Sequence, residues 1–201
     1  MPTDLDLCRH VHALVADLAA EHGEVDLVGR RVGCAPDARD ALVETFDAFG
    51  VVGGAGVRVR DREGRVLLVR YEGADGWIDP GGSRLPGESY RACARRAVRE
   101  TTGVETTVGD LAQVHLLYMD DWTDREPVPN PYVSFEGQVN DTGTVTGTVT
   151  GTGEEGSEGG SGAEGRDGAT GPAADVAEVR WTDIIPEDLL YEELAELALG
   201  T

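Results

Sequence analysis

Three charged side chains near the middle of the chain, Arg84, Glu88 and Glu100, are of types that bind phosphate groups or hard cations. Glu88 precedes a predicted helix over residues 89–102, and Glu100 lies near the end of that helix. Two carboxylates can form part of a magnesium site when a bound phosphate group supplies further oxygens. Arg84, in the loop before the helix, carries the planar guanidinium group that suits phosphate oxygens. These residue types are therefore candidates for contacts to phosphate oxygens and to a divalent cation.

These residues belong to a longer pattern that begins at Gly81 and Gly82. From Gly82 the sequence reads G-S-R-L-P-G-E-S-Y-R-A-C-A-R-R-A-V-R-E-T-T-G-V. This stretch resembles the Nudix box, G-x5-E-x7-R-E-U-x-E-E-x-G-U, in which U is a bulky aliphatic residue. Seven of the nine fixed positions match, at Gly82, Glu88, Arg96, Val98, Glu100, Gly103 and Val104.

The resemblance to the Nudix family implies an α/β/α sandwich around a mixed β-sheet, and a hydrolase that cleaves a diphosphate bond in a nucleoside-diphosphate-X compound. In that family, divalent ions such as Mg²⁺ or Mn²⁺ activate the water that attacks phosphorus. Carried over to this sequence, the implied catalytic residues are Glu100, Glu88 and Arg96. The implied substrate contacts are Arg84, Gly81 and Gly82, and the implied metal ligands are Glu100, Glu88 and Glu178.

The sequence departs from the family pattern at two positions of the box. Ala97 and Thr101 occupy positions at which the family has glutamate. Carboxylates at positions 97, 100 and 101 would share one face of the helix and bind hard cations together. Their loss leaves a second hypothesis open, in which the protein is a catalytically impaired module that binds a phosphorylated nucleotide or metabolite. A third hypothesis gives the N-terminal helices a role in contacts with a partner or in a homodimer.

The elements that must position these residues follow from hydrophobic periodicity. Residues 1–50 predict a helical extension, with one helix that stops at Gly23 and a second that runs from Pro36 to Gly50. Residues 51–201 predict the Nudix domain. Its expected elements are a β-hairpin over 57–71, the helix over 89–102, strands over 111–118, 132–139 and 176–181, and a closing helix over 186–199.

One segment lacks the apolar residues that a core needs. Residues 140–172 contain Thr-Gly repeats and Glu/Gly/Ser tracts, and they hold 11 of the 28 glycines of the chain. Such a composition does not repay the entropy lost on ordering. We therefore expect a disordered acidic insertion between two strands.

Charge restricts the partners and the environment of the protein. Seventeen basic residues, all arginine, stand against 38 acidic ones, which gives a net charge of −21. This charge argues against binding to nucleic acid or to an anionic membrane. An acidic protein without lysine is typical of extreme halophiles, so we expect a cytoplasmic protein that needs molar salt. Three scattered cysteines predict neither disulfides nor a zinc site.

Overall fold

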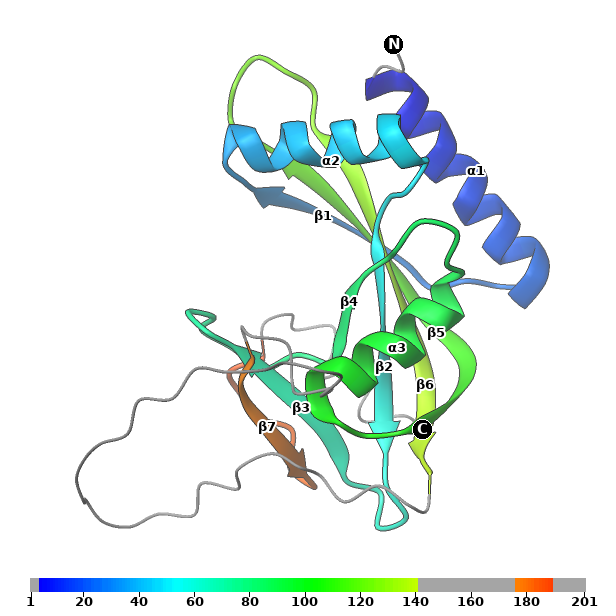
Figure 1. Ribbon diagram of the computed structural model, residues 1–201, viewed down its shortest axis with the longest axis vertical. Helices are drawn as coiled ribbons and strands as arrows, with labels where there is room; N and C mark the ends of the chain where they lie inside the picture. Colours follow the sequence, from blue (N-terminus) through cyan, green and yellow to red (C-terminus); the bar gives the residue numbers. More distant parts are fainter. Residues whose placement is uncertain (1–3, 141–175, 190–201) are drawn as a thin grey trace, which may run out of the picture.

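The fold is built around one mixed β-sheet with helices on both sides (Figure 1). The computed structural model describes residues 4–140 and 176–189. Along the chain the elements are α1 (Asp4–His22), β1 (Leu27–Gly33), α2 (Pro36–Phe49), β2 (Gly54–Arg60), β3 (Val66–Tyr71), β4 (Gly81–Ser83), α3 (Tyr90–Thr102), β5 (Thr106–Asp120), β6 (Val128–Val139) and β7 (Val176–Thr182).

The seven strands are arranged in the order β1-β5-β6-β2-β3-β7, and the short β4 pairs with β2. Two of the pairings are parallel, β1 with β5 and β2 with β6, and the remaining ones are antiparallel. The sheet is therefore mixed, as the Nudix resemblance implies. The expected hairpin is present as β2 and β3, which are joined by a turn at Asp61–Arg65.

The helices end where the sequence predicts. Gly23, Gly50 and Gly103 follow α1, α2 and α3, and each has a positive φ, which glycine adopts without steric cost. The N–H of Gly103 donates to the carbonyl of Arg99, and Ser89 caps the first turn of α3 by accepting from the N–H of Ala92. The box residues on α3 are thus held by defined ends.

The main core lies between the sheet and the helices. Cys93, Ala94 and Val98 on α3 pack with the inward side chains of β2 and β6, and Leu7 and Val11 on α1 join the same cluster. α3 lies across β2 in Figure 1. The burial of these apolar side chains fixes the height of α3 above β2 and β4.

The N-terminal 50 residues differ from the expected pair of helices by one strand. β1 lies between α1 and α2 and pairs in parallel with β5, from Leu27 opposite Val114 to Gly33 opposite Asp120. Every second residue of β1 is exposed, and Arg30, Arg31 and two glycines interrupt its apolar pattern. Because such a strand buries little apolar surface, its hydrophobic periodicity is too weak to predict it.

The C-terminal expectations are met in part. β7 forms as predicted, whereas residues 186–189, the start of the expected closing helix, are not helical, and Leu189 bridges to Trp77 instead. The rest of that helix and the expected disordered insertion, apart from Asn140, lie outside the described residues. Within the described ranges, no helix has the length and apolar character needed to cross a membrane.

Candidate functional site

Glu88, Arg96 and Glu100, the charged residues that match fixed positions of the box, form one ion-pair cluster. The Arg96 Nε donates to Glu88 Oε1 at 2.8 Å, and its Nη2 donates to Glu88 Oε2 at 2.9 Å. Its Nη1 donates to Glu100 Oε2 at 2.7 Å, one turn further along α3. Glu88, Arg96 and Glu100, the catalytic residues that the Nudix resemblance implies, thus lie together. One guanidinium serves both carboxylates.

The cluster is also fixed to the backbone around β4. Arg96 Nη2 donates to the carbonyl of Ser83 at 2.8 Å, and the N–H of Leu85 donates to Glu88 Oε2 at 3.0 Å. The hydrogen bonds from Arg96 lower the pKa of Glu88 below its usual value, against the opposing effect of its partial burial. Arg96 thus favours the ionised form of Glu88 and balances its charge.

The two replaced box positions face the interior. The side chains of Ala97 and Thr101 are buried. Thr101 Oγ1 donates to the carbonyl of Ala97 at 2.8 Å, so its proton is used within the helix. A methyl group and an internally bonded hydroxyl thus stand where the family pattern has carboxylates. Neither offers the strong anionic oxygen that Mg²⁺ prefers.

Glu178, the third predicted metal ligand, is not part of this cluster. It lies on β7 and accepts from Arg70 Nη2 at 2.5 Å across the β3–β7 ladder. Among residues 4–140 and 176–189, no three His, Cys, Asp or Glu side chains gather in a way that could hold a metal ion. The prediction of Glu100, Glu88 and Glu178 as one metal site is therefore not met. Nudix hydrolases generally use divalent ions, but the donors present here do not fit one.

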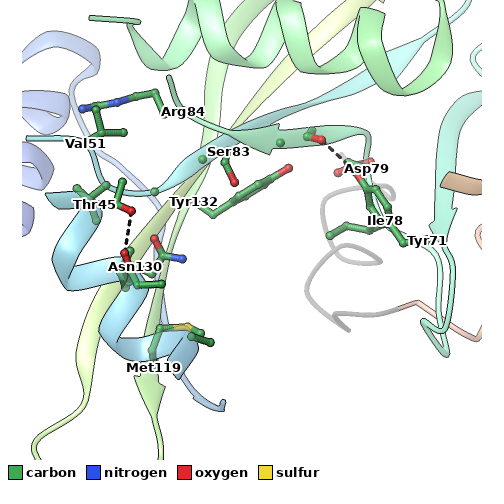
Figure 2. A pocket seen from close by; sticks show the side chains of 18 residues that line it. Thr45, Val51, Tyr71, Ile78, Asp79, Ser83, Arg84, Met119, Asn130 and Tyr132 are labelled. Carbon is green, nitrogen blue, oxygen red and sulfur yellow. Dashed lines mark hydrogen bonds between the residues drawn. The ribbon is translucent and has the colours of Figure 1, made fainter. Parts of the chain in front are cut away.

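The residues predicted to contact substrate line a pocket on the other side of β4. Gly81, Gly82 and Arg84 border this pocket, whose volume is about 500 Å³ (Figure 2). The guanidinium of Arg84 lies over the ring of Tyr90, 4.6 Å from its centroid. Its Nε is buried and has no hydrogen-bond partner within the described part of the chain. Ser83 connects the two regions, because it lines the pocket and its carbonyl binds Arg96.

Gly81 has a steric role in building this pocket. A Cβ at Gly81 would overlap the hydroxyl of Tyr132 and lie 2.7 Å from the carbonyl oxygen of Ala55 on β2. Gly82 is less restricted, since its Cβ would lie 3.2 Å from that of Ala97. Glycine at position 81 thus lets β4 pair closely with β2 while Tyr132 reaches across the sheet.

Asp79 is a wall residue whose charge is already paired. It lines the pocket, and its carboxylate accepts from Arg58 Nη2 at 2.9 Å. Both side chains are buried, and this burial raises the pKa of Asp79 against the lowering effect of Arg58. Glu136, nearby on β6, also has a pKa raised by burial. Asp79 therefore supplies a fixed, neutralised wall and is not available as a free base.

Other wall residues were not predicted from the sequence as site residues. Thr45 comes from α2, and Asn130 and Tyr132 come from β6 (Figure 2). Tyr132 comes close to β4 because β6 pairs in parallel with β2, which also pairs with β4. The one local signal was the run Pro129-Asn130-Pro131, because prolines within a strand mark an unusual backbone position.

The family model described as the NUDIX domain matches residues 51–160. No curated protein matches the sequence.

Similar solved structures include an Ap4A hydrolase of C. elegans in a binary complex, with 17% identity, coverage of 74% of this chain and 93% of that chain, and a TM-score of 0.48. A UDP-X diphosphatase has 16% identity, coverage of 95% and 78%, and a TM-score of 0.43. The MutT protein of Methanosarcina mazei Go1 has 25% identity, coverage of 47% and 69%, and a TM-score of 0.36.

Proposed function

This chain belongs to the Nudix family, and we propose that it binds a phosphorylated, nucleotide-like small molecule in the pocket beside β4. We further propose that it acts mainly as a binding module in which metal-assisted hydrolysis is impaired. One observation carries the proposal: a single guanidinium, Arg96, makes three hydrogen bonds to Glu88 and Glu100, while Ala97 and Thr101 replace the other box carboxylates.

Charge balance supports this proposal. A divalent cation at Glu88 or Glu100 would have to compete with a guanidinium that is already hydrogen-bonded to both carboxylates. Charge-assisted bonds of this kind are short and about twice as strong as neutral ones. The pocket, in contrast, contains Arg84, whose buried Nε has no partner among the described residues. Recognition of a phosphate group there needs no metal from the box.

Hydrolysis remains the second candidate function, and a specific observation favours it. Glu88, Arg96 and Glu100 keep the spacing of the box, and the side chain of Glu100 is 42% exposed. In this alternative the protein is a hydrolase that cleaves a diphosphate bond in a nucleoside-diphosphate-X compound, with Mg²⁺ or Mn²⁺. The two candidates differ in turnover and agree on the class of ligand.

The test compares binding with turnover. We would incubate purified protein in molar KCl with ADP-ribose, dinucleoside polyphosphates or nucleoside triphosphates, with Mg²⁺ or Mn²⁺, and measure affinity and product. We expect binding without turnover by the native protein, and turnover by an Ala97→Glu/Thr101→Glu variant. Turnover by the native protein that Glu100→Ala abolishes would establish the hydrolase instead. Circular dichroism must show that the double variant folds, since both positions are buried.

A second measurement locates the ligand. Arg84→Ala is expected to weaken binding of the same nucleotide about tenfold or more, because a charge-assisted contact to phosphate is lost. Arg95→Ala is the matched control, since Arg95 is exposed on α3 and does not line the pocket. Equal affinities of the two variants would remove Arg84 from the site.

The remaining expectations from the sequence stand as parts of the same proposal. We propose a cytoplasmic protein with a small-molecule ligand as its partner, without nucleic acid or membrane, and with a homodimer as a further possibility. The charge of −21 supports the exclusion of polyanionic partners.

A further inference from the structure

We infer that α2, in the N-terminal segment outside the family match, is the specificity wall of the ligand pocket, and that it selects together with Asn130 for a planar heterocycle such as a nucleobase. The inference rests on the proposed function, because it concerns the same pocket. It adds the part of the ligand that is recognised and the residues that recognise it.

The shape of the pocket supports a flat ligand. Its α2 side is formed by Ala38, Ala41, Leu42 and Thr45, and all of these except Leu42 have small side chains. Its sheet side includes Met119 and Tyr132 (Figure 2). A flat aromatic ring can stack on a tyrosine ring or on a thioether, and small residues on the opposite wall leave room for its thickness. Larger residues on α2 would close that space.

Asn130 provides the polar contact that such a ring needs. Its Oδ1 is buried, lines the pocket region on β6, and has no hydrogen-bond partner within the described ranges. The amide group offers one acceptor and two donors. An amide of this kind pairs with an edge that carries an N–H next to a ring nitrogen, as it does with adenine in DNA. A buried unpaired acceptor costs free energy, and a ligand N–H would satisfy it.

The hydroxyl of Thr45, on the α2 side of the pocket, already donates a hydrogen bond within the helix. Thr45 Oγ1 donates to the carbonyl of Ala41 at 2.7 Å, within the helix. Its proton is therefore not available to a ligand, and α2 contributes shape. Asn130 contributes the hydrogen bonds.

Two arginines hold the wall in place. Arg39 on α2 is buried, pairs with Asp4 of α1 at 2.5 Å, and donates to the carbonyl of Glu126 at 2.9 Å. Arg125, in the connection between β5 and β6, pairs with Asp40 on α2 at 2.6 Å. α2 is thus tied to α1 and to the β5–β6 connection. A fixed wall discriminates between ligands because it cannot move to accept a wrong one.

The test separates the ring from the phosphates. We would measure calorimetric affinities for ATP, GTP, CTP, UTP and inorganic tripolyphosphate in molar KCl, with native protein, Ala41→Leu and Ala48→Leu. Ala48 is exposed on the same helix and does not line the pocket, so it is a matched control. We expect Ala41→Leu to weaken the best nucleotide roughly tenfold and to leave tripolyphosphate unchanged, while Ala48→Leu changes neither.

Asn130→Ala gives the second arm. We expect it to reduce the difference in affinity among the four nucleotides without changing the affinity for tripolyphosphate. Equal nucleotide affinities of Ala41→Leu and Ala48→Leu, or a native protein that binds nucleotides no better than tripolyphosphate, would overturn this inference alone. A native protein that binds none of the five probes would overturn the proposed function as well. Circular dichroism and the unfolding midpoint confirm that each variant is folded.

Discussion

At the scale of single residues, Arg96 determines the electrostatics of the box. It binds Glu88 through two hydrogen bonds and Glu100 through one, and it also binds the carbonyl of Ser83 next to the pocket. Glu88 is mostly buried, whereas Glu100 is partly exposed. The Glu88–Arg96 pair is therefore the part of the cluster on which folding depends most.

We predict that this pair makes stability depend on pH. The pKa of Glu88 is lower in the folded protein than in the unfolded chain, where it is about 4.3. The stabilisation is thus complete above pH 4.3 and is lost as the pH falls through the lower folded pKa. Glu88→Gln should reduce the free energy of unfolding by about 1–3 kcal/mol at pH 7. The difference from native protein should shrink below about pH 4.

Denaturant unfolding at pH 7, 5 and 3, at constant KCl concentration, checks this prediction. Glu44→Gln, at an exposed position on α2, serves as the control and should have little effect. A deficit of Glu88→Gln that stays the same from pH 7 to pH 3 would contradict the assignment of the effect to the ionised pair.

The sequence predicts which box residues meet, but it does not predict how their charges are shared. Spacing on α3 places Arg96 beside Glu100, and Glu88, just before the Ser89 cap of the same helix, reaches the same guanidinium. The pocket is different, because Asn130 and Tyr132 reach β4 only through strand pairing between distant segments. No local pattern records such a pairing. Glu178 is the opposite case. The resemblance groups it with the box residues, but the strand register places it opposite Arg70 on β3.

At the scale of elements, β4 lies between the box and the pocket. It pairs closely with β2, and its residue Ser83 both lines the pocket and binds Arg96. The register places Gly81 opposite Gly56 and Gly82 opposite Ala55. The hydroxyl of Tyr132 lies where a Cβ at either Gly81 or Gly56 would project. Two glycines and one tyrosine thus form a single packing unit.

We predict that Gly81→Ala destabilises the protein by about 1–3 kcal/mol or more, because the new methyl group meets both Tyr132 and the backbone of β2. Gly82→Ala should cost less, since its nearest neighbour is the methyl group of Ala97. Thermal unfolding of both variants measures the difference. A Gly81→Ala/Tyr132→Phe double variant should recover part of the loss. A Gly82→Ala variant less stable than Gly81→Ala would refute this account.

The ends of the helices are predictable because they depend on local chemistry. Glycine with positive φ follows α1, α2 and α3, and the position of each glycine is visible in the sequence. β1 is not predictable in the same way. Its alternating exposure and its arginines do not distinguish it from a loop, and only the edge of β5 makes it a strand. The helices of the N-terminal segment can thus be predicted from local sequence, whereas its strand forms only through pairing with β5.

At the scale of the whole molecule, charge is the dominant property. A net charge of −21 on 201 residues produces self-repulsion that favours the unfolded chain at low ionic strength. The ion pairs of Arg39, Arg96 and Arg125 each offset a small part of this repulsion locally. Dissolved salt would screen the repulsion between exposed carboxylates that these pairs leave.

We predict that the unfolding midpoint rises steeply between 0.1 and 2 M KCl. At about 1 M salt the Debye length is only about 3 Å, so repulsion between exposed carboxylates is almost fully screened. Thermal unfolding monitored by circular dichroism at several KCl concentrations checks the prediction. A variant in which Glu44, Asp47 and Glu72 become the corresponding amides should show a weaker dependence. A native protein equally stable in dilute buffer would contradict the halophilic hypothesis.

The parallel pairing of β1 with β5 also has a consequence for the order in which the chain is made. Asp26 and its hydrogen-bond partner Gln113 are 87 positions apart. At synthesis rates of about 5–20 residues per second, the N-terminal segment leaves the ribosome several seconds before its partner strand exists. During that interval α1 exposes Leu7 and Val11, which the finished protein buries completely. The segment over residues 4–33 thus exists for several seconds before the strand with which it pairs.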